Sequence, residues 1–205
     1  MRNVKTAHRA MLGAITLMFA LSAQEPTCHR CSATFIGTSE LQAYLKRAVE
    51  NDLVDQQVRS VDLGKTQLAL GIVHRGRLPA PAKDSVAEHD LISEVYHVID
   101  GSATLVTGPD LVDPQRRPSN LQTVREFNGP GNNARSIRNG VTHNLKAGDV
   151  IIIPAGTGHW FTRIDDHITY LIVRIDPDKA VPLKDEAASQ AYLRSPVKKG
   201  SGKER

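Results

Sequence analysis

The 205-residue chain has little cysteine and few aromatic residues. It contains two cysteines, and Phe, Trp and Tyr together make up 4% of the residues. Two cysteines cannot build a disulfide framework, and no second CxxC is present to complete a four-thiolate zinc site. We therefore predict a local disulfide between Cys28 and Cys31, and a redox pair is the alternative.

The chain also lacks an apolar run of the roughly 20 residues that a membrane-spanning helix needs. Its most apolar segment, AMLGAITLMFA, follows a basic start, MRNVKTAHR, and precedes the small residues ALSA. This order is typical of a signal peptide, which we place at residues 1–23. The sequence therefore predicts an exported protein, periplasmic or extracellular, with no stable membrane insertion once the signal is removed.

Strong net charge is absent as well. The formal charge is +4, and Arg2, Lys5 and Arg9 of the predicted signal peptide supply three of these charges, which leaves +1 for the rest. No stripe of Lys and Arg with interleaved aromatic residues remains, so we expect no nucleic-acid partner.

Short strand-like segments separated by Gly and Pro turns dominate what is there. Because they do not alternate with helices, the pattern predicts an all-β fold, a double-sheet barrel, with a short N-terminal helix over residues 40–51. We divide the chain into a Cys-containing segment at 24–37, a single domain at 38–180, and a C-terminal helix with a basic tail at 181–205. Residues 108–134 are expected to be a long connector without regular structure, either a lid or a surface insertion.

The most informative stretch is residues 148–163, GDVIIIPAGTGHWFTR. The aliphatic run at 150–153 predicts a strand buried on both faces, which Pro154 ends. A glycine-containing turn then places His159 at the start of the next strand. By strand alternation, His159, Phe161 and Arg163 share one face.

Residues 85–101, SVAEHDLISEVYHVIDG, supply the counterpart. Glu94 and Tyr96 share one face of a strand that we expect to end in a hairpin turn at Asp100 and Gly101. His89 lies five residues before Glu94, so the two converge only if the chain bends near Asp90. With that bend, His89, Glu94 and His159 form a set of two imidazoles and one carboxylate that can hold one divalent metal ion. His74 is a further candidate ligand, although a partly exposed histidine at a strand end is the simpler reading.

These two stretches resemble the motifs of the cupin family. His89, Glu94 and Gly101 match the second histidine, the glutamate and the last glycine of G(X)5HXH(X)3-4E(X)6G. Gly148, Pro154, Gly156 and His159 match G(X)5PXG(X)2H(X)3N. Ala87 stands at the first histidine position and Arg163 at the closing asparagine, so the chain offers at most three of the four usual ligands. The resemblance implies a cupin-type double-stranded β-helix, a jelly-roll barrel, over residues 58–175, and a homodimer.

The metal set and the resemblance together predict an exported mononuclear metal-dependent enzyme for a small oxygen-rich or carbonyl substrate, of the oxygenase (oxidoreductase), lyase or isomerase type. Tyr96 is the expected general acid or base, and Arg163 the expected clamp for an anionic group. Iron is the first choice of metal and manganese, zinc, nickel and copper are the others, with zinc and copper favoured by export. The alternatives are a non-catalytic small-molecule-binding cupin and a structural β-barrel dimer.

Overall fold

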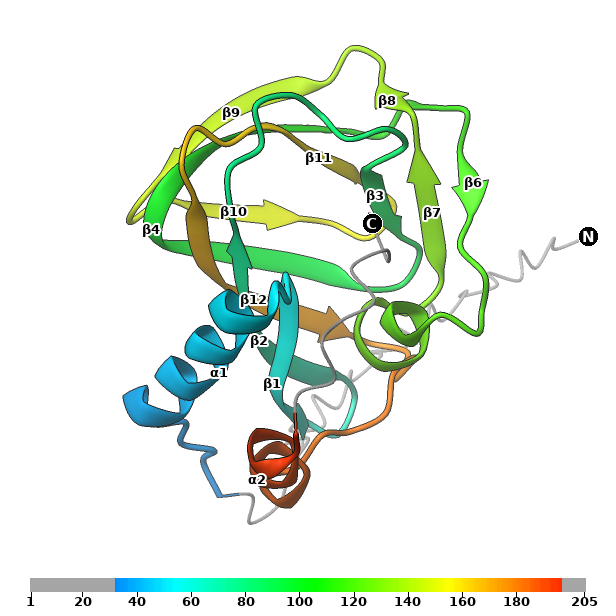
Figure 1. Cartoon of the computed structure of the whole chain (residues 1–205). Coiled ribbons are helices and arrows are strands. Elements are labelled where there is room, and N and C mark those ends of the chain that lie inside the picture. Colours follow the sequence, from blue (N-terminus) through cyan, green and yellow to red (C-terminus); the bar gives the residue numbers. More distant parts are fainter. Residues whose placement is uncertain (1–31, 197–205) are drawn as a thin grey trace, which may run out of the picture.

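The computed structural model describes residues 32–196, which fold into a β-barrel with two helices against one side (Figure 1). The predicted signal peptide and both cysteines lie outside the described residues. The elements in chain order are α1 (Thr38–Asn51), β1 (Asp55–Asp62), β2 (Gln67–Arg75), β3 (Val86–His89), β4 (Ser93–Gly108), β5 (Leu111–Val112), β6 (Gln115–Arg116), the π-helix η1 (Val124–Asn128), β7 (Gly131–Ala134), β8 (Ser136–Ile137), β9 (Val141–Lys146), β10 (Val150–Ile153), β11 (Gly158–Arg163), β12 (Ile168–Asp176) and α2 (Glu186–Arg194).

Strand β4 belongs to both halves of the barrel. Its first half pairs with β12 and β10, and its second half pairs with β11 and β9, all antiparallel. The path β1-β2-β12-β4 forms one half, and β4-β11-β3-β7-β6 forms the other. This antiparallel arrangement of two connected sheets around one core confirms the predicted all-β jelly-roll class.

The predicted hairpin turn at Asp100 and Gly101 is wrong. The chain runs through this point as one strand of 16 residues. Opposite it, the register with β12 shifts between Thr169 and Tyr170, and Gly101 has φ of +77°. The strand therefore carries a bulge over residues 99–101, in which Ile99 is the extra residue and Gly101 has the positive φ, and this bulge bends β4 from one sheet into the other.

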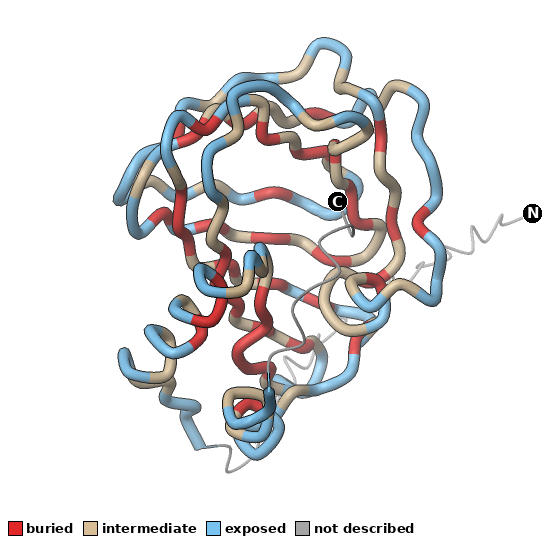
Figure 2. The backbone as a smooth tube through the Cα atoms, in the orientation of Figure 1, coloured by how far each residue is buried: buried red, intermediate tan, exposed pale blue. Residues whose placement is uncertain are grey.

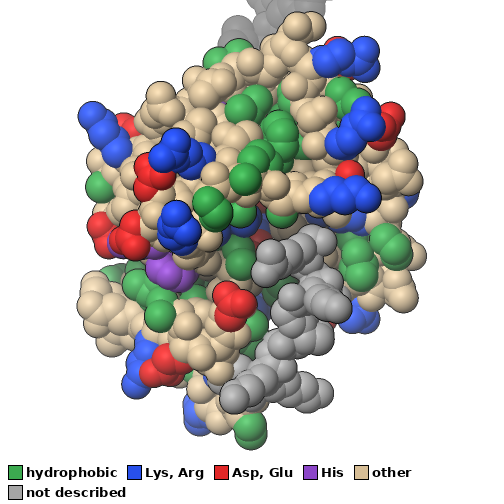
Figure 3. Space-filling view, turned by 45° about the horizontal axis from the view of Figure 1, so that its top comes forward, with side chains coloured by type: hydrophobic (Ala, Val, Ile, Leu, Met, Phe, Trp, Pro, Cys, Tyr) green, Lys and Arg blue, Asp and Glu red, His purple; other side chains and the backbone are tan. Residues whose placement is uncertain are grey.

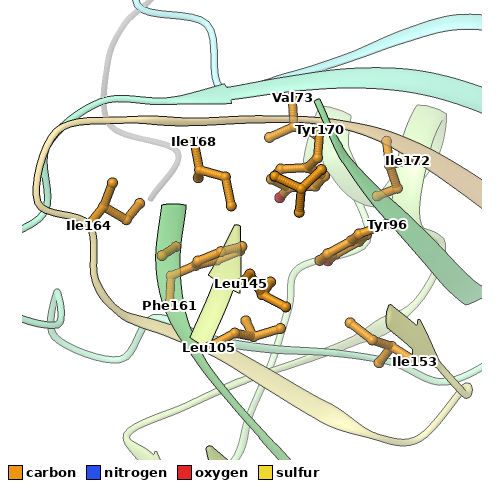
Figure 4. Packing of buried hydrophobic residues seen from close by; sticks show 12 residues of the cluster. Val73, Tyr96, Leu105, Leu145, Ile153, Phe161, Ile164, Ile168, Tyr170 and Ile172 are labelled. Atoms are coloured by element: carbon orange, nitrogen blue, oxygen red, sulfur yellow. The ribbon is translucent and has the colours of Figure 1, made fainter. Parts of the chain in front are cut away.

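The core fills the space between the two sheets (Figure 4). Its aromatic centre consists of Tyr96, Phe161 and Tyr170, with ring centroids 4.5 Å apart for Tyr96 and Tyr170 and 5.9 Å apart for Phe161 and Tyr170. Aliphatic side chains from β2, β4, β9, β10 and β12 surround these rings. Figure 2 shows the same concentration of buried positions along the strands.

Helix α1 covers the outer face of β1 and β2, where Tyr44 packs with Val58 and Ile72 in a second buried cluster. Helix α2 packs on α1, and the rings of Tyr44 and Tyr192 stack at 5.4 Å. Both helices confirm sequence predictions. Among residues 32–196, no helix is long and apolar enough to cross a membrane.

Strand β10 departs from the prediction of burial on both faces. Val150 is 59% exposed and Ile152 is 68% exposed. The physical reason is that side chains alternate along β10, so Ile151 and Ile153 face the core while Val150 and Ile152 lie on the outer face of the barrel, which is exposed there.

The connector at 108–134 also differs from the prediction of an irregular loop. It contains β5, β6, η1 and β7, and β6 and β7 extend the sheet beyond β3. These strands are too short to give a periodic sequence signal, so backbone pairing with β3 decides them.

The described surface is of mixed charge. On the face shown in Figure 3, Lys and Arg side chains lie among acidic and hydrophobic ones and form no continuous basic patch. The absence of a nucleic-acid partner stays a prediction.

The bulge at Gly101 can be tested by comparing Gly101→Ala with Gly148→Ala. Both glycines have positive φ, which costs a non-glycine residue about 1–2 kcal/mol. A Cβ at 148 meets nothing within 4 Å, whereas a Cβ at 101 overlaps the backbone carbonyl of His167. We expect Gly101→Ala to lower the free energy of unfolding by about 1–3 kcal/mol more than Gly148→Ala, measured by denaturant titration. Equal losses would contradict the bulge.

Candidate metal centre

Three separate segments bring His89, Glu94 and His159 together. His89 ends β3, Glu94 is the second residue of β4, and His159 is the second residue of β11. Strand pairing stops between β3 and β4 at residues 90–92, which is the bend that the spacing of His89 and Glu94 requires. One ligand atom from each residue lies within 4.8 Å of the others, so the group could hold a metal ion.

The three side chains lie close together and are almost completely buried. His89 Nε2 lies 3.3 Å from Glu94 Oε1, and His159 Nε2 lies 3.6 Å from Glu94 Oε2. The two imidazole rings are 5.1 Å apart. Exposure is 4% for His89, 2% for Glu94 and 7% for His159.

The same elements carry the two sequence motifs. His89 and Glu94 come from β3 and β4, and the β10–β11 hairpin, which holds the second motif, pairs with both of these strands. The motif residues thus meet inside a two-sheet barrel. The fold is therefore consistent with the cupin jelly roll. Ala87, at the position of the first motif histidine, pairs directly with His159, so this chain offers three ligands there.

No protein-family model and no curated protein matches the sequence. Similar solved structures include the Bacillus halodurans protein BH2720, at 15% identity and a TM-score of 0.40, covering 79% of this chain and 97% of the other. A cupin protein of Bacteroides fragilis has 13% identity, a TM-score of 0.36 and coverages of 83% and 98%.

The DMSP lyase DddQ of Ruegeria pomeroyi has 14% identity and a TM-score of 0.38. That match covers 70% of this chain and 53% of the lyase, so the chain spans about half of the lyase. Likenesses at these identities and TM-scores carry no argument about function, and the argument therefore comes from the site itself.

His159 presents a lone pair to a carboxylate. Its Nδ1 lies 3.3 Å from the carbonyl oxygen of Thr157, which can only accept, so Nδ1 carries the proton. Burial lowers the pKa of His159 to about 4, so the ring is neutral near pH 7 and Nε2 is unprotonated. The Nε2 lone pair then faces Glu94 Oε2 with no proton between them, an arrangement that a cation would stabilise.

His89 is held differently, by Arg117 of the connector. Arg117 Nη2 lies 3.0 Å from His89 Nδ1. Since a guanidinium only donates, Nδ1 accepts, and the proton of a neutral His89 lies on Nε2, facing Glu94 Oε1. His89 can bind a metal through Nε2 only after Nε2 loses this proton. The ring then stays neutral only if Nδ1 takes up a proton, which requires Arg117 to release Nδ1.

Glu94 also has partners that do not depend on a metal. Arg174 lies directly opposite it on β12, with Nε 3.4 Å from Glu94 Oε1, and also pairs with Asp55. Burial alone would raise the pKa of Glu94. His89, whose Nε2 proton faces the carboxylate, and the charge of Arg174 outweigh that effect and hold its pKa well below the usual value, so Glu94 is ionised.

Tyr96 lies beside the group as predicted. Its hydroxyl donates to Glu94 Oε2 at 2.7 Å, and its ring meets His159 edge-on at 6.3 Å. Burial, and then the charge of Glu94, raise the pKa of Tyr96 well above its usual value. The phenol is therefore protonated and fixes the orientation of the carboxylate.

The structure does not bring Arg163 to this group, which corrects the predicted shared face with His159. A bulge between Phe161 and Arg163 inserts one residue into β11, and this turns Arg163 outward. Its side chain is 65% exposed, and Nε donates to Asp165 at 2.7 Å. His74 is not in the group either, because its Nδ1 contacts Thr169 Oγ1 at 2.9 Å and its ring lies against His167.

Sequence reasoning missed two cations, Arg174 and Arg117. The first had a readable signal, because Arg174 is in phase with Ile168, Tyr170 and Ile172 on the inward face of its strand, where a charge needs a partner. Arg117 had none, since it lies in a connector without periodicity.

The burial of His159 predicts an acid-dependent loss of stability in metal-free protein. Its pKa is about 4 when folded and about 6.5 in an unfolded chain, so the unfolded chain binds more protons between these values. The free energy of unfolding should therefore fall as the pH drops from about 6.5 towards 4.

The measurement is denaturant titration across this range on chelator-treated wild type and His159→Asn. We expect a flatter profile for the variant, which has no group to protonate. Parallel profiles would show that His159 is not buried in the neutral state.

Proposed function

We propose that this cupin is a mononuclear metal-dependent enzyme that acts on a small oxygen-rich or carbonyl substrate. One observation carries the proposal: the unprotonated Nε2 of His159 faces an ionised, buried Glu94, with His89 beside them. A lone pair and a carboxylate in contact within an apolar barrel repel each other unless a cation lies between them.

The donor set fits one divalent ion. Two imidazoles and one carboxylate suit iron(II), manganese, zinc, nickel or copper and leave coordination positions for a substrate. Iron stays the first choice on ligand type, and export, which residues 1–23 predict, would favour zinc or copper. A bound ion would supply Lewis acidity and a position for substrate oxygen.

The residues around the ligands have definite tasks in this proposal. Thr157 O holds the proton of His159 on Nδ1 and so keeps Nε2 available. Tyr96 orients Glu94 and holds a proton on its hydroxyl, which makes it a proton donor in this state and not a base. Burial of all three ligands keeps bulk water away from the reacting atoms.

A second candidate is a cupin that binds a small molecule without turnover. The observation in its favour is Arg174, which compensates the charge of Glu94 and lessens the need for a metal. Metal binding without any change of a bound substrate would support this candidate.

Metal content separates these cases. We expect the purified wild-type protein, reconstituted and dialysed, to hold about one equivalent of a divalent metal by elemental mass spectrometry. His89→Ala, His159→Ala and Glu94→Gln should each lose it, because each removes one of three ligands. His143→Ala is the matched control, since His143 bonds to Thr107 on another part of the barrel. A metal-free wild type, or equal metal content in all variants, would overturn the proposed site.

Tyr96→Phe tests the orientation of Glu94. Loss of a hydrogen bond to a metal ligand typically lowers metal affinity about 10- to 100-fold. Tyr170→Phe is a close control, because Tyr170 is equally buried but its hydroxyl bonds to Arg75. Competition with a chelator measures both affinities, and equal values would show that Tyr96 does not support the ligand.

A further inference from the structure

Arg117 is a buried cation with no acidic partner. Its side chain is 9% exposed, and among the described residues it forms no ion pair. Three carboxylates lie near enough to affect its pKa, and each is bound to another group. Glu88 accepts from Asn132 at 2.6 Å, Asp90 pairs with Arg116 at 2.6 Å, and Glu94 accepts from Tyr96 at 2.7 Å.

The position of Arg117 is fixed at both ends of the residue. Its backbone N–H donates to Gly131 O at 3.0 Å, which continues the pairing of β6 with β7, and Pro118 then ends the strand. At the other end, Nη2 donates to the carbonyl oxygen of Glu88. Gly131 makes room for the guanidinium, because a Cβ there would lie 2.5 Å from Nη2.

The guanidinium thus lies at the edge of the metal centre. The Nη2 group donates hydrogen bonds to Glu88 O and His89 Nδ1. The Nε group is buried and has no hydrogen-bond partner within residues 32–196. Leaving such a charged donor unpaired in a protein interior is costly, and the usual compensation is an anion. Arg174, the other buried arginine beside Glu94, already has Asp55.

We propose that Arg117 binds the carboxylate of the substrate, so that the substrate class of this cupin is a small organic carboxylate. The inference rests on the proposed metal function and narrows it. A divalent ion with Glu94 as its acidic ligand leaves one positive charge, Arg117 adds a second, and Arg174 is balanced by Asp55. A carboxylate bound by Arg117 beside the ion would reduce this excess, because it is ionised near pH 7 and its planar pair of oxygens matches the guanidinium group.

This assignment places the anion-binding role, predicted for Arg163, on a residue of the connector. Arg163 is exposed and paired with Asp165, whereas Arg117 is buried, unpaired and in contact with a metal-ligating histidine. An anion that drew the guanidinium away from His89 Nδ1 would also free that ring for ligation, which would couple the binding of anion and metal.

The test uses the full chain loaded with zinc, which is redox-inert, and calorimetric titration with acetate and with its neutral analogue acetamide. We expect wild type to bind acetate at least tenfold more tightly than acetamide. Arg117→Met, of similar length without charge, should lower acetate affinity at least tenfold. Arg135→Met is the matched control and should leave it unchanged, because Arg135 is exposed and pairs with Asp113.

Arg117→Lys, which retains the charge, should keep more acetate affinity than Arg117→Met, and it remains informative if the methionine variant does not fold. Zinc content is measured on every sample, and since Arg117 is not a ligand, Arg117→Met should hold as much zinc as wild type.

Full zinc content with unchanged acetate affinity in Arg117→Met overturns this inference and leaves the metal function standing. So does equal binding of acetate and acetamide by wild type. If wild type takes up no zinc, the metal function fails, and Arg117-dependent acetate binding by the metal-free protein would still support the anion site.

Discussion

The structure depends on keeping one carboxylate charged inside a β-barrel. Glu94 is almost completely shielded from water, yet its neighbours hold its pKa below the usual value. Removing an unpaired ion from water costs several kcal/mol, so the surrounding strands must each contribute a partner. Tyr96 comes from the same strand, Arg174 from β12 and His89 from β3, whereas His159 of β11 presents a lone pair that the proposed cation would separate from the carboxylate. The strands that form the barrel core therefore also supply the side chains of the candidate site.

The topology explains why these partners can meet at Glu94. Strand β4 is shared by both sheets, and Glu94 lies near its start, where β10 and β12 flank it. The break at residues 90–92 returns β3 towards the same point, and the β10–β11 hairpin brings His159 opposite β3. The bulge at Gly101 bends β4 so that its second half can pair with β11. A local backbone feature about 7 residues from Glu94 thus helps to close the barrel around the site.

Two buried arginines place positive charge beside Glu94 and His89. Arg174 is shared between Glu94 and Asp55 and lowers the cost of burying the carboxylate. Among residues 32–196, Arg117 has no such partner and donates to a histidine instead. The charge of Arg174 is compensated within the protein, whereas the partner that we propose for Arg117 is the carboxylate of a ligand. In that proposal the connector that carries Arg117 contributes to the binding site and also extends the sheet.

The sequence by itself determined the β class, both helices and the convergence of His89, Glu94 and His159, because strand alternation, turn residues and motif spacing are local properties. The tertiary structure alone decided which side chains compensate Glu94, since Arg117 and Arg174 reach the site from segments distant in sequence. It also decided that Arg163 points outward, because a bulge reverses side-chain alternation. Val150 and Ile152 are exposed because they lie on the outer face of the barrel, and only the tertiary structure shows whether a second layer covers that face. The alternation of apolar and polar residues in the sequence indicates which residues of a regular strand share a face. The pairing of strands that are distant in sequence decides which residues that face contacts.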